Sequence, residues 1–76
     1  MKPCILILTC ADDKEANRII KVLLDKKLIV CAKKSPVTST FYWKGKTENA
    51  DEVLLIMDST EELFKKAEVE VRKLHS

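Results

Sequence analysis

The apolar residues of this chain fall into short continuous runs and into a helical spacing, and the two patterns alternate. "CILILTC" (4–10) is a run rich in Ile and Leu, which is typical of a strand buried on both faces. "LIVCA" (28–32) and "VTSTFYW" (37–43) are rich in strand-favouring side chains, and "DEVLLIMD" (51–58) is again apolar without alternation. We therefore expect three strands, the second of which runs from 28–32 into 37–43.

Two segments contain residues that interrupt strands. Ser35-Pro36 predicts a bend or an edge position within the second strand, because proline cannot donate to a sheet ladder. Residues 44–50 hold Gly45, Asn49 and polar neighbours. We expect them to connect the second and third strands as an antiparallel hairpin.

Two segments show the spacing of an amphipathic helix. Asp12 is the expected N-cap of the first helix, with Glu15 in capping-box spacing, and Ser59 and Glu62 repeat this arrangement for the second. The apolar stripes are formed by Ala16, Ile19, Ile20, Leu23 and Leu24 in the first helix and by Leu63, Ala67, Val71 and Leu74 in the second. The first helix is expected to end near residues 26–27, where two lysines suit the negative end of its dipole.

The order strand, helix, strand, strand, helix predicts an α+β layout. Both helices should cover one face of an antiparallel sheet, because crossover connections are right-handed. Within 4–8 and 53–57 residues of both parities are apolar, so about six large side chains should face away from the helices. Burying them is worth roughly 10–18 kcal/mol, comparable to the stability of a whole domain. A second layer must cover this face, and another copy of the chain is the simplest candidate.

Composition and charge narrow the class of protein. The 76 residues make a single domain, 1–76, and 46% hydrophobic with 34% charged residues is typical of an ordered, soluble domain. The 14 basic and 12 acidic residues are interspersed, whereas nucleic-acid binding needs basic residues on one face. Three cysteines are too few for a secreted disulfide framework, and no apolar run is as long as a signal peptide or a membrane span. We therefore expect a cytoplasmic protein that binds neither nucleic acid nor membrane.

Few side chains could carry chemistry. One histidine, one glycine and carboxylates placed among lysines offer no catalytic arrangement and no phosphate-binding glycine loop, so we do not expect an enzyme. Cys10, Cys31 and His75 together would suit soft or borderline ions such as copper or zinc. No CxxC or HxxxH spacing fixes a site, and structural thiols are the alternative interpretation of both cysteines.

Three of the four aromatic residues are consecutive: Phe41, Tyr42 and Trp43. On a strand, Phe41 and Trp43 point one way and Tyr42 the other. A stacking platform for single-stranded nucleic acid would spread its aromatics along a basic groove. Here they cluster beside a tight turn, which favours packing in a core or at a subunit contact.

The segment "LLDKKLIVCAKKSPVTSTFYWKGKTENADEVLLIMDST" (23–60) resembles the CutA divalent-cation-tolerance family. That family has an "L-A-A-C"-like strand, then "P-x-x-S-x-Y-x-W-x-G" and a Glu that opens the third strand. The final "RKLHS" is similar to the start of the family's "H-P-Y" segment. The matching positions are Cys31, Pro36, Ser39, Trp43, Gly45, Glu52 and His75.

The resemblance implies a ferredoxin-like βαββαβ sandwich, of which this chain lacks the last strand. It implies a non-enzymatic homotrimer in which the second and third strands join sheets between subunits. It also implies a link to tolerance of copper and other divalent cations, and direct Cu(II) binding would involve His75 with a cysteine, Cys10 or Cys31. The residues expected at the subunit interface are Phe41, Tyr42, Trp43, Gly45 and Glu52.

The chain departs from the family pattern at several positions. Phe41 stands where the family usually has Tyr, and Asp58 stands where it often has Lys. A cysteine implicated in copper binding in some members aligns at Thr9, with Cys10 one residue away. Adjacent strand residues face opposite ways, so Cys10 does not simply replace that cysteine.

Two other functions remain open from the sequence. Nitrogen-regulatory PII proteins share this fold and trimeric state, so the chain could be a small-molecule signalling module with ligands in inter-subunit clefts near Lys44 or Lys46. A trimeric scaffold without any ligand is the third interpretation.

Overall fold

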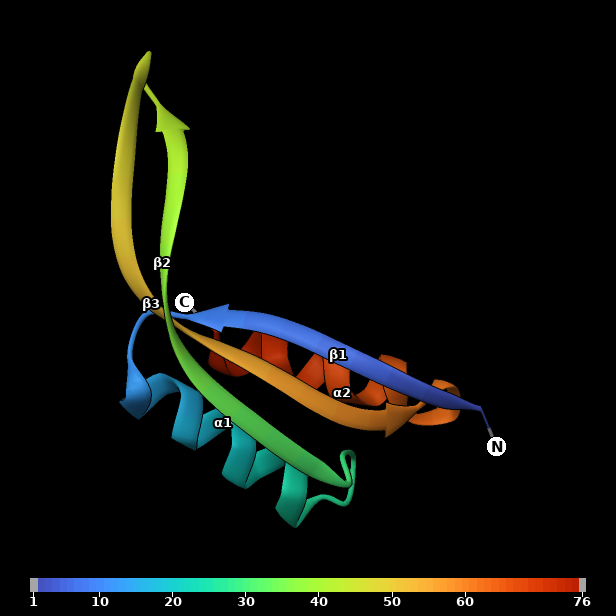
Figure 1. Ribbon diagram of the computed structural model, residues 1–76. Helices are drawn as coiled ribbons and strands as arrows, with labels where there is room; N and C mark the ends of the chain where they lie inside the picture. Colours follow the sequence, from blue (N-terminus) through green and yellow to red (C-terminus); the bar gives the residue numbers. More distant parts are fainter. Residues whose placement is uncertain (1, 76) are drawn as a thin grey trace.

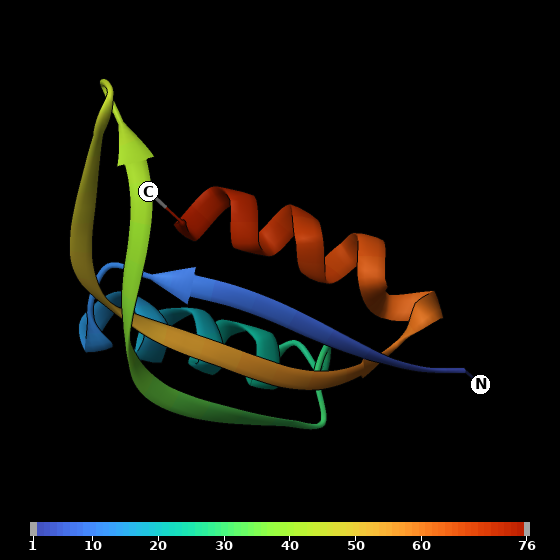
Figure 2. The same cartoon turned by 45° about the horizontal axis from the view of Figure 1, so that its top comes forward.

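The computed structural model describes residues 2–75, with two helices on one face of an antiparallel sheet (Figures 1 and 2). The sheet has three strands in the order β1-β3-β2. This is the predicted α+β, ferredoxin-like arrangement. The elements in chain order are β1 (Pro3–Cys10), α1 (Asp13–Asp25), β2 (Cys31–Trp43), β3 (Lys46–Thr60) and α2 (Glu61–Leu74).

The core lies between the two helices and the covered face of the sheet. Ile19 and Leu23 of α1 and Ala67 of α2 are fully buried, as are Leu55 and Met57 of β3. The predicted stripes therefore face the sheet, with one exception. Leu24, the last residue of the predicted stripe of α1, is 42% exposed and lies outside the core.

Local hydrogen bonds explain the two ends of α1. Asp12 is the N-cap and accepts from the backbone N–H of Glu15 at 2.8 Å, as predicted. At the other end, Leu28 N–H donates to the carbonyl of Leu23 and Lys27 N–H to that of Leu24. These two bonds form a Schellman motif, in which Lys27 adopts the left-handed conformation (φ 58°) that glycine normally supplies.

The second strand differs from its prediction. Residues 28–30 are a loop, and β2 begins only at Cys31, because the Schellman motif and the packing of Leu28 and Ile29 into the core occupy this segment. The ladder of β2 is not interrupted at Ser35-Pro36, although the strand curves strongly between the body and the arm of the molecule (Figures 1 and 2). Pro36 is paired with Val53 and is tolerated because β2 is an edge strand of the three-stranded sheet.

The expected loop over 44–50 is wrong, because β3 already begins at Lys46. Lys44 and Gly45 alone make the turn, both with positive φ as in a type I′ hairpin. The polar residues between the turn and the body of the sheet continue the ladder instead of leaving it. Two cross-strand hydrogen bonds help to hold them there: Thr38 Oγ1 to Asp51 Oδ1 at 3.2 Å and Thr40 Oγ1 to Asn49 Oδ1 at 2.9 Å.

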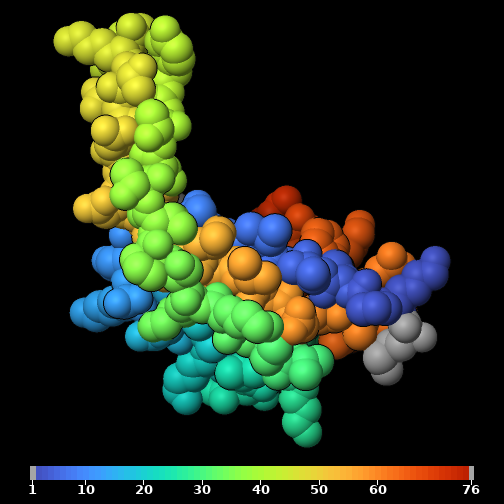
Figure 3. Space-filling model, viewed as in Figure 1, coloured from blue at the N-terminus to red at the C-terminus, as the bar shows by residue number. Residues whose placement is uncertain are grey.

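This hairpin forms an arm, which we define as residues 37–52. It projects away from the helix-covered body of the molecule (Figures 1 and 3), and the chain measures 43 × 23 × 21 Å.

The predicted cap of the second helix is also wrong. The N-cap of α2 is Thr60, not Ser59, and its side chain makes no capping hydrogen bond. Ser59 is buried in the last part of β3, and its hydroxyl donates to the carbonyl of Leu28 at 2.6 Å. The Ser59 side chain therefore bonds to the loop that follows α1, whereas the sequence pattern predicted that it would cap α2.

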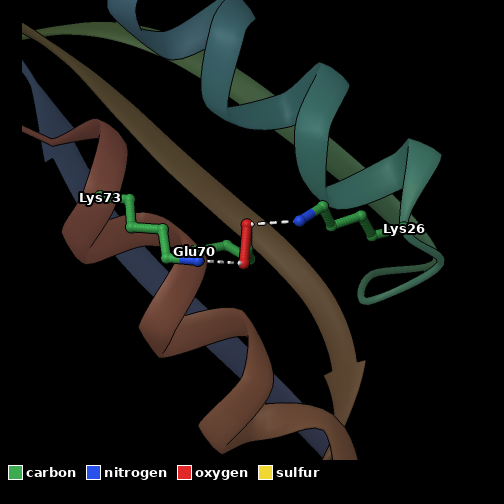
Figure 4. A network of polar contacts seen from close by, with 3 residues as sticks. All are labelled: Lys26, Glu70 and Lys73. Carbon is green, nitrogen blue, oxygen red and sulfur yellow. Dashed lines mark hydrogen bonds and ion pairs between the residues drawn. The ribbon is translucent and has the colours of Figure 1, made fainter.

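A three-residue polar network joins the two helices (Figure 4). Glu70 of α2 accepts from Lys26 Nζ at 2.7 Å, just past the end of α1, and from Lys73 Nζ at 3.4 Å within its own helix. The pKa of Glu70 lies below its usual value, mainly because the carboxylate accepts the hydrogen bond from Lys26.

Candidate functional site

The structure places His75 and Cys10 at the same end of the molecule. His75 follows α2, and its Nε2 lies 2.8 Å from the backbone carbonyl oxygen of Thr9, next to Cys10 in β1. The Cys10 side chain itself is buried in the core. Burial, followed by the negative charges of Glu15, Asp12 and Glu52, raises the pKa of this thiol. The thiolate form that binds metals is therefore disfavoured at Cys10.

Cys31 lies apart from these two residues. Cys10 pairs with Val53 and Cys31 with Asp58, five positions further along β3, which is about 17 Å of strand. An odd separation also places the two cysteines on opposite faces of the sheet. Within residues 2–75 no group of three or more His, Cys, Asp or Glu side chains is arranged to hold a metal ion. The three sequence-predicted metal residues are thus not brought together in the single chain.

Cys31 instead belongs to a polar cluster that the sequence pattern did not reveal. Its Sγ lies 2.8 Å from Asp58 Oδ2, and Lys33 Nζ lies 3.7 Å from Sγ and 3.5 Å from the same carboxylate oxygen. The hydrogen bond from the thiol and then the charge of Lys33 lower the pKa of Asp58. The charge of Asp58 is in turn the main cause that raises the pKa of Lys33. The strand register is needed to predict this cluster, because Asp58 is 25 or more residues away in sequence from the other two members.

The face of the sheet away from the helices, which we call the open face, is apolar in its centre. Ile5 and Ile7 of β1 are 62% and 69% exposed, and Leu54 and Ile56 of β3 beside them are half-buried. The prediction of an apolar face is confirmed, with these four large aliphatic side chains in place of the expected six or so. An exposed patch of this kind marks an interaction surface.

The aromatic residues of the arm are exposed in the single chain. The exposed fractions are 43% for Phe41, 79% for Tyr42 and 59% for Trp43. Phe41 pairs with Glu48 and Trp43 with Lys46, and their positions are odd-numbered in β2, as is that of Cys31. The side of the arm that carries Phe41 and Trp43 is therefore a continuation of the open face, whereas Tyr42 points to the other side.

The other expected interface residues also lie on the arm. Glu52 pairs with Val37, which places it on the same side as Phe41 and Trp43, and Gly45 makes the turn. Lys44 Nζ lies 5.8 Å from the centroid of the Trp43 ring, within the range of a cation–π contact.

An apolar depression of about 260 Å³ borders the open face between β1 and α2. Ile5, Ile7 and Met57 line it from the sheet, and Phe64 and Val71 from the helix. Its lining supplies no nucleophile or acid–base pair. Across residues 2–75, no helix combines the length and the apolar character needed to cross a membrane.

Comparison with known proteins identifies the family. The model of the CutA1 divalent ion tolerance protein family matches residues 4–76. The chain is 39% identical over 71 residues to the divalent-cation tolerance protein CutA of Archaeoglobus fulgidus, and 31% identical over 71 residues to that of Pyrococcus horikoshii. Each alignment covers 93% of this chain and 70% of the relative. Protein CutA of Mus musculus is 34% identical over 68 residues, which are 88% of this chain and 38% of the mouse protein.

Solved structures agree with the sequence comparison. The structure of the periplasmic divalent cation tolerance protein CutA from Archaeoglobus fulgidus superimposes with a TM-score of 0.91 at 38% identity, covering 97% of this chain and 72% of the other. CutA1 from Ehrlichia chaffeensis gives a TM-score of 0.92 at 31% identity, with coverage of 97% and 70%. The chain therefore belongs to the CutA1 divalent ion tolerance protein family.

Proposed function

We propose that this protein acts in divalent-cation tolerance as a non-enzymatic homotrimer. The observation that carries the proposal is that two exposed apolar groups lie on the same side of the sheet, Ile5 and Ile7 on the open face and Phe41 and Trp43 on the arm. Full burial of the two exposed isoleucines alone would contribute about 3–6 kcal/mol per copy. A second copy of the chain offers the same apolar surface, so packing copies against one another covers it.

The arm supplies the reach that such an assembly needs. It projects beyond the body of one chain (Figure 3), with Phe41 and Trp43 on the side that continues the open face. Large aromatic side chains are enriched among residues that dominate binding energy at protein interfaces. In our proposal the arm of one subunit lies against the open face of its neighbour, with Tyr42, Gly45 and Glu52 also at the contact.

Direct binding of Cu(II) is part of the same proposal. His75 is the proposed ligand, because its imidazole is the one such group in the chain and lies at the surface beside the end of β1. Of the two candidate thiols, Cys10 is the nearer to His75, because it is next to Thr9 at the end of β1. Its side chain is buried and would have to leave the core to reach a bound ion. Cys31 would contribute only from a neighbouring subunit, since it lies on the other face of its own sheet.

Native mass spectrometry with and without Cu(II) tests both parts. We expect a mass of three chains and a copper-dependent increase that His75→Ala abolishes without changing the number of chains. A monomer mass would refute the trimer, and an unchanged mass with copper would refute direct binding. Addition of a nucleotide in the same experiment tests the small-molecule signalling alternative.

We also propose a cytoplasmic location. Its support is that Cys4, Cys10 and Cys31 are all unpaired thiols, as is usual in a reducing compartment. The relative from Archaeoglobus fulgidus is described as periplasmic, so the location needs its own test. Cell fractionation with an antibody to the chain would decide it, and recovery in a periplasmic or secreted fraction would contradict the proposal.

A further inference from the structure

We propose that the free edge of β1 pairs with the same edge of a second copy, antiparallel, about a two-fold axis at Leu6. Within residues 2–75 the strand order is β1-β3-β2, so β1 has a neighbouring strand on one side only. The pairing would join two three-stranded sheets into one continuous sheet. It goes beyond the proposed homotrimer, which uses the open face and the arm, and it does not depend on that trimer.

The two edges of the sheet differ in the residues that discourage pairing with another chain. At one edge, the body of β2 carries Lys33, Lys34 and Pro36, all exposed. Charged residues and proline on an edge strand oppose edge-to-edge association. At the other edge, β1 (Pro3–Cys10) has no charged residue, and its one proline is at the first position. The edge of β1 is therefore the one that can accept another strand.

Two hydrogen bonds show which backbone groups of β1 face its free edge. Glu61 N–H donates to the carbonyl of Lys2, and these two residues lie opposite each other just beyond the β1–β3 ladder. Even-numbered residues of β1 therefore direct their backbone groups to β3, and odd-numbered residues direct theirs to the free edge. The second bond agrees, because His75 Nε2 lies 2.8 Å from the carbonyl oxygen of Thr9 and a carbonyl oxygen only accepts. His75 thus donates to one acceptor of the free edge.

The edge is complementary to itself. With Leu6 opposite Leu6 of a second copy, Ile5 lies opposite Ile7 in both halves of the pair. Each of these two Ile5–Ile7 pairs would exchange two backbone hydrogen bonds. Their β-branched side chains would form cross-strand pairs on the open face. The two Leu6 side chains would meet on the helix side, beside the apolar depression between β1 and α2.

The ends of the strand select this register. Thr9 lies opposite Pro3 of the second copy, and its N–H can donate to the proline carbonyl. Proline has no N–H to return, so the Thr9 carbonyl would lack a donor, and His75 supplies that donor within the chain. A shift by two residues in one direction would leave the Ile7 carbonyl opposite Pro3. A shift in the other direction would bring Ile5 N–H to the carbonyl that His75 already uses.

Disulfide cross-linking tests the register and traps the pair even where it forms weakly. The native cysteines are first removed (Cys4→Ala, Cys10→Ala and Cys31→Ser). Leu6→Cys then places two thiols directly opposite each other, with Cα atoms about 4.5 Å apart, within the range of disulfides. Leu8→Cys is the matched control, because it is also half-buried on the helix side but its two copies would be about 13 Å apart. We expect linked dimers of Leu6→Cys to form at least about tenfold faster under mild oxidation.

Two further variants of the Leu6→Cys chain test the backbone pairing. Ile7→Pro removes an N–H that faces the second copy and leaves the β1–β3 ladder intact, and it should lower the rate to that of the control. Ile7→Ala shortens the same side chain but keeps the N–H, and it should retain most of the difference. Equal rates for Leu6→Cys and Leu8→Cys, or equal losses in the two Ile7 variants, would overturn the inference. The edge would then be left to an extended strand of a different protein.

Native mass spectra of the oxidised Leu6→Cys sample separate this inference from the proposed function. A cyclic trimer has no two-fold axis, so the trimer contact alone does not bring two Leu6 positions together. Trimers joined in pairs by disulfides would support both proposals. Linked pairs of chains without trimers would refute only the trimer, and unlinked trimers would refute only the edge pairing.

Discussion

β3 passes through two regions of the molecule that are stabilised differently. In the body, alternate residues of β3 from Val53 to Ser59 are buried beneath the helices. In the arm, residues 46–49 of the same strand are all exposed, and they are held by the ladder, the turn and the side-chain bond from Thr40 to Asn49. An isolated two-stranded hairpin is marginally stable at best in water. The contrast indicates that the body provides most of the stability of the chain, and in our proposal the arm provides the contacts between subunits.

The largest effect is expected from a core substitution in the body. Leu55→Ala removes a fully buried side chain at the centre of the core and should lower the free energy of unfolding by about 2–5 kcal/mol. Thr40→Ala in the arm removes only an exposed hydrogen bond to Asn49 and should change it by less than about 0.5 kcal/mol. Urea denaturation of both variants provides the measurement. Equal effects would show that the arm is as much a part of the folding core as the body.

The second prediction concerns the arm as a contact element. Trp43→Ala should weaken self-association by about 2 kcal/mol or more, as expected for a central aromatic at an interface. Tyr42→Ala is the matched variant, because Tyr42 is adjacent but points to the other side of the arm. Its effect should be smaller. Sedimentation velocity over a dilution series measures both, and a larger loss in Tyr42→Ala would place the contact on the opposite side of the arm.

The division between body and arm also explains what the sequence could predict. The helix stripes and the apolar runs follow directly from burial, so α1, α2, β1 and the centre of β3 were predictable from periodicity. The arm contains polar residues such as Thr47 and Asn49, which resemble loop residues because no core selects their composition. Their strand conformation depends on the partner strand and on the turn, which a single-sequence pattern does not specify.

For the candidate sites, too, the sequence pattern could not specify features that depend on strand register. The exposed apolar face was predictable, since both parities of the strands are apolar. The grouping of Cys10, Cys31 and His75 was suggested by residue type alone, and the register separates Cys31 from the other two by face and by distance. The Cys31–Asp58 contact depends on where β2 begins, and the sequence pattern placed that start three residues too early, at residue 28.

A smaller effect is expected at two lysines with left-handed backbone, one in each region. Lys27 ends α1 in the body (φ 58°) and Lys44 lies in the turn of the arm (φ 52°). Replacement by glycine removes a conformational cost of about 1 kcal/mol at either position. Lys27→Gly should raise the free energy of global unfolding by about that amount, with Lys27→Ala as the control that gives no gain. Lys44→Gly should instead slow hydrogen exchange within the arm, and an equal gain in global stability would remove the distinction between the regions.

The smallest effect is expected from the ion pair that joins the helices of the body. The pKa of Glu70 is lowered from its ordinary value of 4.5, first by the hydrogen bond from Lys26. A carboxylate whose pKa is lower in the folded state contributes stability above its unfolded pKa, and this contribution is lost as the pH falls through the folded pKa. The free energy of unfolding should therefore decrease below about pH 4.5, and Glu70→Gln should reduce that slope. The effect should shrink in high salt, because the lysine side chains are exposed.

The ion pair should not affect the arm, since Glu70 and its lysine partners lie outside it. In Glu70→Gln, hydrogen exchange in residues 38–49 should therefore keep the same protection relative to the body. A selective loss of arm protection in Glu70→Gln would show that the two regions are coupled through α2.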